Sequence, residues 1–176
     1  MFNIEKFGLK RGDLVLLDSA PIIYFIEGRE ARGSSTGDRA SVVNLIVDSA
    51  RSGEIRLAAS SIVWAECLIG PLGAANTHRA DEYRRLLSDS RTLVIEPADV
   101  AIAEEAARLL ASPSPPGFAD AFHIATAAVI NADVIITNDE AWRKTIKAAS
   151  LSASPSLTAK YRSMRILIVD ELTFEV

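Results

Sequence analysis

The segment FADAFHIATAAVINADVIITND, residues 118–139, joins an apolar helical stretch to a short buried strand and decides the fold. Its composition indicates a helix over Asp120–Ile130, and the run Asp133–Ile136 is a strand rich in valine and isoleucine. A strand without polar alternation is typical of a parallel sheet that is covered on both faces. The segment therefore indicates one helix–strand unit of an α/β fold.

The same alternation extends through the rest of the chain. Apolar stretches predict four further strands, at Asp13–Leu17, Ile55–Ala58, Thr92–Ile95 and Arg165–Val169. Helical spacing of apolar residues appears over 42–50 and 102–110, and another helix is expected at Ile62–Ile69. We therefore predict an α/β fold, a three-layer α/β/α sandwich around a central, mostly parallel five-stranded sheet.

Turn-rich or serine-rich segments predict the main loops, which are Gly28–Gly37, Ser112–Gly117 and Ala148–Ala159. None of them is long or biased enough to serve as a linker between domains, and no internal repeat is present. A chain of 176 residues suits one domain with a substantial core. We therefore expect a single domain over residues 1–176.

The composition, with 49% hydrophobic and 24% charged residues, is that of a globular protein and excludes a disordered tail or a fibrous repeat. No uncharged run reaches the length of a membrane span, and the N-terminus lacks the pattern of a signal peptide. The single cysteine, Cys67, cannot form an internal disulfide, which fits a reducing compartment. These features predict a cytoplasmic protein that does not contact a membrane.

The formal net charge of −4 bears on the kind of nucleic-acid protein that the chain could be. Proteins that coat nucleic acids usually carry positive charge. Carboxylates that hold divalent cations are different, because the cations reverse the local sign of the charge. The charge thus disfavours a nucleic-acid-coating protein more than it disfavours a metal-dependent nuclease.

Four acidic residues fall at the ends of predicted elements. Asp18 directly follows the first strand, and Asp139 closely follows the fourth. Asp120 is expected to open the helix that leads to the fourth strand, where the helix dipole favours an acid. Glu66 lies early in the helix after the second strand. Because ligands of open parallel sheets bind beyond the carboxyl ends of the strands, these positions predict a site.

Carboxylates within a few ångströms of one another repel and raise one another's pKa. Such a cluster either shares protons or coordinates hard cations. Oxygen ligands without a cluster of histidines and cysteines favour Mg²⁺ or Mn²⁺ over zinc. One or two such cations suit the hydrolysis of a phosphodiester bond.

Three segments resemble, in order, the acidic motifs of PIN domains: LLDSAPIIYFIEG (16–28), SSIVWAECLIG (60–70) and FADAFHIATAAVINADVIITND (118–139). The resemblance runs from about Asp13 to Asp139. It implies RNA cleavage that depends on Mg²⁺ or Mn²⁺, often by the toxin of a VapBC-type toxin–antitoxin pair. Ser19 stands where many members of the family have threonine, and it keeps the hydroxyl group.

Position by position, the resemblance implies that Asp18 and Asp120 are the principal metal ligands. Asp139 would complete the metal shell, and Glu66 would bind metal through water or orient the attacking water. The resemblance further implies RNA as the substrate and a small antitoxin protein that covers the acidic groove. It also allows a homodimer. The chain is longer than a compact toxin of this class, chiefly through Gly28–Gly37 and the stretch after Trp142.

Two other functions compete with this interpretation. The negative charge and the added segments would suit a catalytically silent PIN-like binding or regulatory module, although the intact set of acids argues against it. A phosphohydrolase or receiver-like domain would also place Asp at strand ends. Phosphatases of the haloacid type need a second Asp two residues after the first, and Ala20 occupies that position here.

Each candidate residue also has an ordinary structural interpretation. An Asp after a strand or before a helix is usually a turn former or a cap. His123 lies one helical turn after Asp120 and could face the same site, but a lone His on an apolar helix is typically a core or edge residue with one satisfied hydrogen bond. Cys67 is interpreted as a buried, inert thiol.

Overall fold

The computed structural model describes residues 4–28 and 34–173, in which five strands form one parallel sheet. The strands lie in the order β3-β2-β1-β4-β5. Their bounds are β1 Leu14–Leu17, β2 Arg56–Ser60, β3 Val94–Glu96, β4 Val134–Thr137 and β5 Arg165–Ile168. All five predicted strands are therefore present, with ends that differ slightly from those expected.

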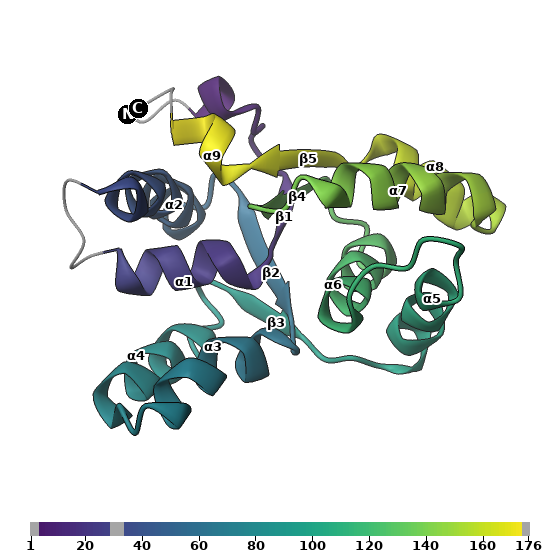
Figure 1. Ribbon diagram of the computed structural model, residues 1–176. Helices are drawn as coiled ribbons and strands as arrows, with labels where there is room; N and C mark the ends of the chain where they lie inside the picture. The colour runs from purple at the N-terminus through teal and green to yellow at the C-terminus, as the bar shows by residue number, and fades with distance from the viewer. Residues whose placement is uncertain (1–3, 29–33, 174–176) are drawn as a thin grey trace.

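Helices cover both faces of the sheet and give the three-layer α/β/α architecture that the sequence predicts (Figure 1). One face carries α1 Ser19–Glu27, α2 Ser35–Arg51, α3 Val63–Gly73 and α4 Thr77–Leu87. The other carries α5 Val100–Leu110, α6 Phe118–Val129, α7 Ala141–Ser152 and α8 Pro155–Ser163. The 3₁₀ helix Ile4–Phe7 and the short α9 Val169–Leu172 pack with the first layer. Within the described residues, no helix is both long and apolar enough to cross a membrane.

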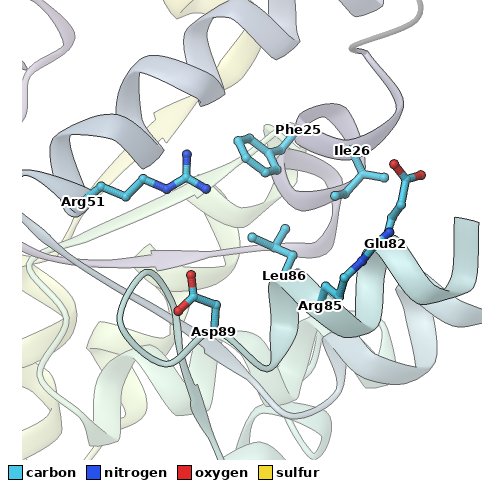
Figure 2. Close-up of a pocket in the computed structure, with 7 residues that line it drawn as sticks. All are labelled: Phe25, Ile26, Arg51, Glu82, Arg85, Leu86 and Asp89. Carbon is cyan, nitrogen blue, oxygen red and sulfur yellow. The ribbon is translucent and has the colours of Figure 1, made fainter.

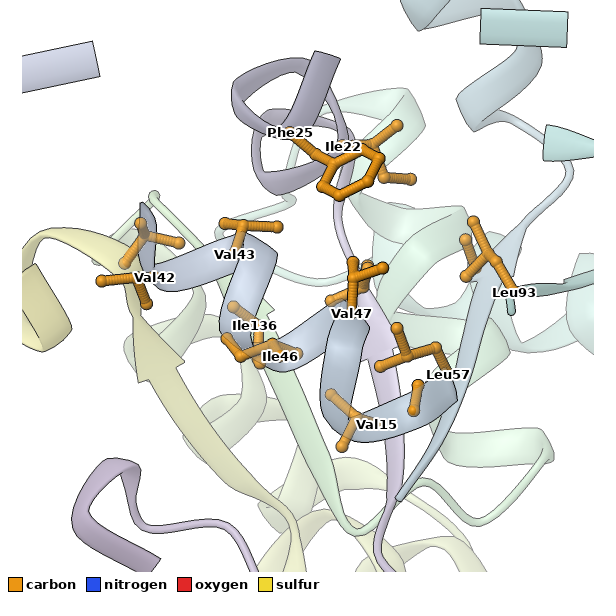
Figure 3. Close-up of a cluster of buried hydrophobic side chains, with 14 of the residues drawn as sticks. Val15, Ile22, Phe25, Val42, Val43, Ile46, Val47, Leu57, Leu93 and Ile136 are labelled. Atoms are coloured by element: carbon orange, nitrogen blue, oxygen red, sulfur yellow. The ribbon is translucent and has the colours of Figure 1, made fainter. Parts of the chain in front are cut away.

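Two hydrophobic cores lie on opposite faces of the sheet because successive side chains of a strand point to opposite sides. From β1, Val15 and Leu17 enter the core beneath α1 and α2, where they meet Phe25 and Ile46 (Figure 3). Leu16, between them, enters the core under α5, α6 and α7. The central strands are thus buried on both faces, which is why they lack polar alternation.

The helix bounds correct two expectations. Helix α6 begins at Phe118 behind Gly117, so Asp120 lies in its first turn and does not open it. Helix α3 continues beyond Ile69 to Gly73, through Pro71. Pro71 is buried, and its packing offsets the backbone hydrogen bond that a proline inside a helix removes.

The expectation of a loop over Ala148–Ala159 is wrong. Helix α7 extends to Ser152, and α8 begins at Pro155, where the fixed φ of proline and its missing N–H suit the first turn of a helix. Ala149 and Ser150 are buried, and α7 packs against α8, where small residues allow close approach. Small residues in this segment therefore reflect close helix packing. The sequence offers no local signal that separates a loop from a closely packed helix.

The expected loop Gly28–Gly37 is also partly wrong. Gly28 follows the last residue of α1, and residues 29–33 lie outside the described ranges. Helix α2 begins at Ser35, and the hydroxyl of Ser34 caps it by accepting the N–H of Gly37 at 3.3 Å. The loop predicted at Ser112–Gly117 does connect α5 and α6.

A buried hydrogen bond joins α8, part of which was expected to be a loop, to α5. The carboxylate of Glu105 is only 5% exposed and accepts hydrogen bonds from the Tyr161 hydroxyl and the Arg108 guanidinium. Burial, and then the neighbouring Glu105, raise the pKa of Tyr161, so its hydroxyl remains protonated and donates. Tyr161 therefore fixes the position of α8 through a single polar contact.

We predict that Tyr161→Phe lowers the free energy of unfolding by about 1.5–3 kcal/mol, because a buried carboxylate loses a hydrogen bond while the ring still packs. Urea denaturation followed by circular dichroism measures the loss. Arg162→Ala, on the exposed side of the same helix, is the control and should change the value by less than about 0.5 kcal/mol. Equal losses in the two variants would contradict this role for Tyr161.

Candidate active site

The order of the strands reverses between β1 and β4. The chain runs from β1 to β2 and β3 on one side, and it returns to the other side of β1 with β4. Such a reversal separates the connections that leave the two strands, and it is where ligands bind in open α/β sheets. Asp18 follows β1 at this point, and its backbone N–H donates to the carbonyl of Ile136 on β4 at 3.0 Å.

The carboxylate of Asp18 is fixed on both of its oxygens. It caps α1, accepting the backbone N–H of Ser19 on Oδ1 at 2.6 Å. Its Oδ2 accepts the hydroxyl of Thr137, the last residue of β4, at 2.7 Å. The side chain is buried, with only 8% of the residue exposed. Its position is therefore set by two neighbouring strands and a helix start.

Glu66 reaches the same point from the first turn of α3. Its Oε2 lies 2.7 Å from Nε2 of His123, and the same nitrogen lies 3.7 Å from Oδ1 of Asp18. Ligand-type atoms of these three residues all lie within 4.8 Å of one another. The structure thus places two of the predicted acids together, with a histidine between them.

Asp120 lies in the first turn of α6, half-buried near this group. Burial is the main cause that raises the pKa of Asp120, and the charges of Asp18, Asp139 and Glu66 raise it further, while His123 lowers it. A Cβ at Gly117 would lie 2.8 Å from Oδ2 of Asp120, so any larger residue there would require the Asp120 carboxylate to shift. Asp120 therefore lies within electrostatic range of the other three acids, but outside the tight group.

Asp139 is the most exposed of the four predicted acids. Its Oδ1 accepts the N–H of Ala141 at the start of α7 at 2.8 Å, and its own N–H donates to the Thr137 hydroxyl at 3.1 Å. Asp139 therefore lies at the rim of the site and also has the capping role that the ordinary interpretation gave it.

His123 is the site residue that the sequence analysis underestimated. It is fully buried, as expected of a core histidine, but it makes two hydrogen bonds and touches the acidic group. The available signal was its position one helical turn after Asp120. Cys67 fits its prediction, because burial raises the pKa of its thiol to about 12 and the thiol stays protonated.

A polar network borders the site at the end of β5. Asp170 accepts two hydrogen bonds from the Arg39 guanidinium, at 2.5 and 2.9 Å, and one from the Asn138 amide at 3.2 Å. Asn138 also donates to the Tyr24 hydroxyl. The hydrogen bond from Arg39 is the main cause that lowers the pKa of Asp170. Asp170 is thus neutralised by its own arginine and does not add an unpaired charge to the acidic group.

A hollow of about 330 Å³ lies apart from the acids, between α1, α2 and α4 (Figure 2). Its lining is of mixed charge and comprises Phe25, Ile26, Arg51, Glu82, Arg85, Leu86 and Asp89. The Arg51 guanidinium lies over the Phe25 ring at 5.9 Å. Because none of the four site acids lines it, this hollow is not part of the acidic site.

The four acids suit a hard divalent cation. Among the described residues, none of Asp18, Glu66, Asp120 and Asp139 has an ion pair with lysine or arginine. Other buried acids do, as Glu105 shows with Arg108. Carboxylate oxygens are the ligands that Mg²⁺ and Mn²⁺ prefer, and a cation would offset the repulsion that raises the pKa of Asp120.

Comparison with known proteins agrees with this fold. A family model of the PIN domain matches residues 15–148. Two solved structures have a similar fold. VapBC2 from Rickettsia felis, bound to a promoter DNA fragment, has a TM-score of 0.57 and 20% identity over 74% of this chain and 92% of that chain. VapBC-1 from nontypeable Haemophilus influenzae has a TM-score of 0.53 and 23% identity over 76% and 92%. No curated protein matches the sequence.

We predict that Asp120→Asn raises the melting temperature of the metal-free protein at about pH 7.5. A carboxyl whose pKa is raised by folding destabilises the native state when ionised, and this cost disappears as the pH falls through the raised pKa. The gain should therefore shrink as the pH is lowered to about 4, because the raised pKa makes Asp120 protonate before an ordinary aspartate does. Thermal unfolding followed by circular dichroism at both pH values checks this.

Exposed Asp48 provides the control, since Asp48→Asn removes the same charge far from the acidic group. A melting temperature of Asp120→Asn below that of the parent at both pH values would contradict the prediction. Added Mn²⁺ should raise the melting temperature of the parent more than that of Asp120→Asn, because binding to the native state stabilises it.

Proposed function

Because the chain belongs to the PIN-domain family, we propose that it is a metal-dependent endoribonuclease that hydrolyses phosphodiester bonds in RNA. One observation carries the proposal. Asp18 and Glu66 come together at the carboxyl edge of the parallel sheet, with Asp120 in electrostatic range, and no lysine or arginine of the described residues neutralises them. A cluster of this kind is the usual protein contribution to phosphodiester hydrolysis with divalent cations.

In this proposal Asp18, Asp120 and Asp139 hold Mg²⁺ or Mn²⁺, and Glu66 binds the cation through water or orients the attacking water. A bound divalent cation supplies positive charge for the attacking and the leaving oxygen of the phosphodiester. Asp18 suits a ligand because its carboxylate is already fixed by Ser19 and Thr137 and needs little reordering. Asp139 is the most accessible of the acids, which suits a ligand at the rim facing the RNA.

Glu66 differs from the three aspartates in its surroundings. It comes from α3, in the opposite layer to Asp120, and its side chain is 29% exposed. A carboxylate that is partly open to solvent and held on one oxygen can accept a hydrogen bond from a water molecule on the other. This arrangement supports a role for Glu66 in placing the water.

We further propose that the protein is the toxin of a type II toxin–antitoxin pair and acts in the cytoplasm. The two similar structures are VapBC complexes, which supports an antitoxin partner for this chain. The antitoxin segment would cover the acidic site and would carry a basic side chain to it, since the acids have no basic partner of their own. A helix laid into a groove is one mode of such binding.

A catalytically silent binding or regulatory module is the second candidate. The net charge of −4 favours it, because an acidic surface without cations repels RNA. The fixed geometry of Asp18 and Glu66 argues against it, since a module that only binds does not need to keep repelling acids together.

We predict that the purified protein cleaves RNA with Mn²⁺ or Mg²⁺ and is inactive in EDTA. Asp18→Asn should lower kcat/KM by about 100-fold or more, because several kcal/mol of transition-state charge stabilisation depend on the cation. Cleavage of a fluorescent RNA, with Mn²⁺ binding measured by calorimetry, provides the test. Asp48→Asn, at an exposed pair on α2, should retain the parent rate. Parent protein that binds Mn²⁺ but cleaves no RNA would favour the silent module.

We also predict that expression of the protein alone arrests bacterial growth and that Asp120→Ala relieves the arrest, because an uncharged side chain cannot hold the cation. Co-expression of a short reading frame immediately upstream should restore growth to cells that express the parent protein. The product of that reading frame should co-purify with the parent protein. Growth counts and affinity purification measure these effects. Arrest that persists in Asp120→Ala would count against a nuclease toxin.

A further inference from the structure

A hydrogen-bonded chain runs from the end of β2 through a buried histidine to the acidic group. The Ser60 hydroxyl, in the last residue of β2, lies 3.1 Å from Nδ1 of His123 on α6. On the other side of the ring, Nε2 lies 2.7 Å from Oε2 of Glu66. His123 and Ser60 are fully buried, and the Trp142 ring stacks on the imidazole at 6.0 Å. Rotation of the imidazole ring would therefore break both hydrogen bonds and its stacking on Trp142.

The partners of the ring assign a role to each nitrogen. The Ser60 oxygen already accepts the backbone N–H of Ile62 at 3.2 Å, so its single proton is available for Nδ1. An ionised Glu66 carboxylate has only acceptor atoms, so Nε2 must donate its proton to it. Both nitrogens are thus engaged, and Nε2, the one nearest the acids, has no lone pair to offer to a cation.

The hydrogen bond joins helices of opposite layers. Helix α3, which carries Glu66, covers one face of the sheet, and α6, which carries His123, covers the other (Figure 1). In the described part of the chain, His123 is the only hydrogen-bond partner of the Glu66 carboxylate. The same Nε2–H lies 3.7 Å from Asp18, so its partial positive charge also reduces the repulsion between the two acids.

We propose that His123 is a positioning residue: it does not bind the metal, but donates a hydrogen bond through Nε2 that holds Glu66 beside Asp18, with Ser60 fixing the ring. The inference deepens the proposed function and rests on it. Residues that orient a metal-site group from behind typically contribute 10–100-fold to metal affinity or activity. If His123 acts only through Glu66, its removal matters only while Glu66 is present.

A double-mutant cycle tests this inference with four proteins: the parent, His123→Leu, Glu66→Gln and the double variant. Leucine keeps the approximate volume of the ring and removes the donor. Two quantities are measured for each protein, the Mn²⁺ dissociation constant by calorimetry and the kcat for RNA cleavage. We expect His123→Leu to lower kcat by about 10–100-fold and to weaken Mn²⁺ binding. The double variant should match Glu66→Gln within about twofold in both quantities.

Conservative and control variants separate positioning from general damage. His123→Gln retains an N–H donor and should recover most of the kcat that His123→Leu loses. Ile124→Val, the next residue on α6, is equally buried but faces the hydrophobic core and should leave Mn²⁺ affinity unchanged. If His123→Leu shows no cooperative melting transition, Ser60→Ala replaces it in the cycle, because it frees the ring without opening a large cavity.

The outcomes distinguish this inference from the proposed function. Positioning through Glu66 would be overturned if the effects of the two single variants multiply in the double variant. It would also be overturned if His123→Leu changes neither the Mn²⁺ dissociation constant nor kcat. If the parent cleaves no RNA, the proposed function fails, but the Mn²⁺ cycle still decides the role of His123. If RNA is cleaved while the effects multiply, the nuclease stands and the positioning role is wrong.

Discussion

Repulsion between carboxylates at one edge of the sheet is the constraint around which the site is built. Nε2 of His123 lies between Asp18 and Glu66 and within hydrogen-bonding distance of Glu66. Asp120 is close enough for the charges of both acids to raise its pKa. Neutral donors partly offset this cost: the Ser19 N–H and the Thr137 hydroxyl bind Asp18, and His123 binds Glu66. No lysine or arginine of the described residues pairs with these acids. The group therefore keeps the net negative charge that a divalent metal requires.

The contrast with the structural acids supports this interpretation. Glu105, Asp170 and Asp13 each pair with an arginine: the first pair lies within α5, the second joins α9 to α2, and the third joins the edge strand β5 to the residue before β1. Burial of Glu105 and Asp13 is tolerated because each has a positively charged partner. No lysine or arginine of the described residues pairs with the four site acids. Their mutual repulsion and burial therefore destabilise the ionised carboxylates, and cation binding would relieve this cost.

The rigidity of the site follows from the two apolar cores. The strands β1 and β4 are buried on both faces, so the residues that follow them, Asp18 and Asp139, start from fixed positions. Helices α3 and α6 bring Glu66 and His123 to the same edge from opposite layers. The hydrogen bond between them joins the two helical layers, and functional groups placed on such regular elements are held more precisely than groups on loops.

The sequence by itself determined the alternation of strands and helices and the four acids at element ends, because both depend on local patterns: apolar runs, and Asp next to strand or helix ends. It misassigned Ala148–Ala159 because small residues suit a loop and a closely packed helix equally well. Only the tertiary structure decided that Asp18 and Glu66 lie within 4.8 Å of each other while Asp139 lies at the rim, and that His123 lies beside both acids. Those contacts join residues far apart in the chain, 57 positions in the pair of Glu66 and His123, and packing of the two layers against the sheet sets their distances.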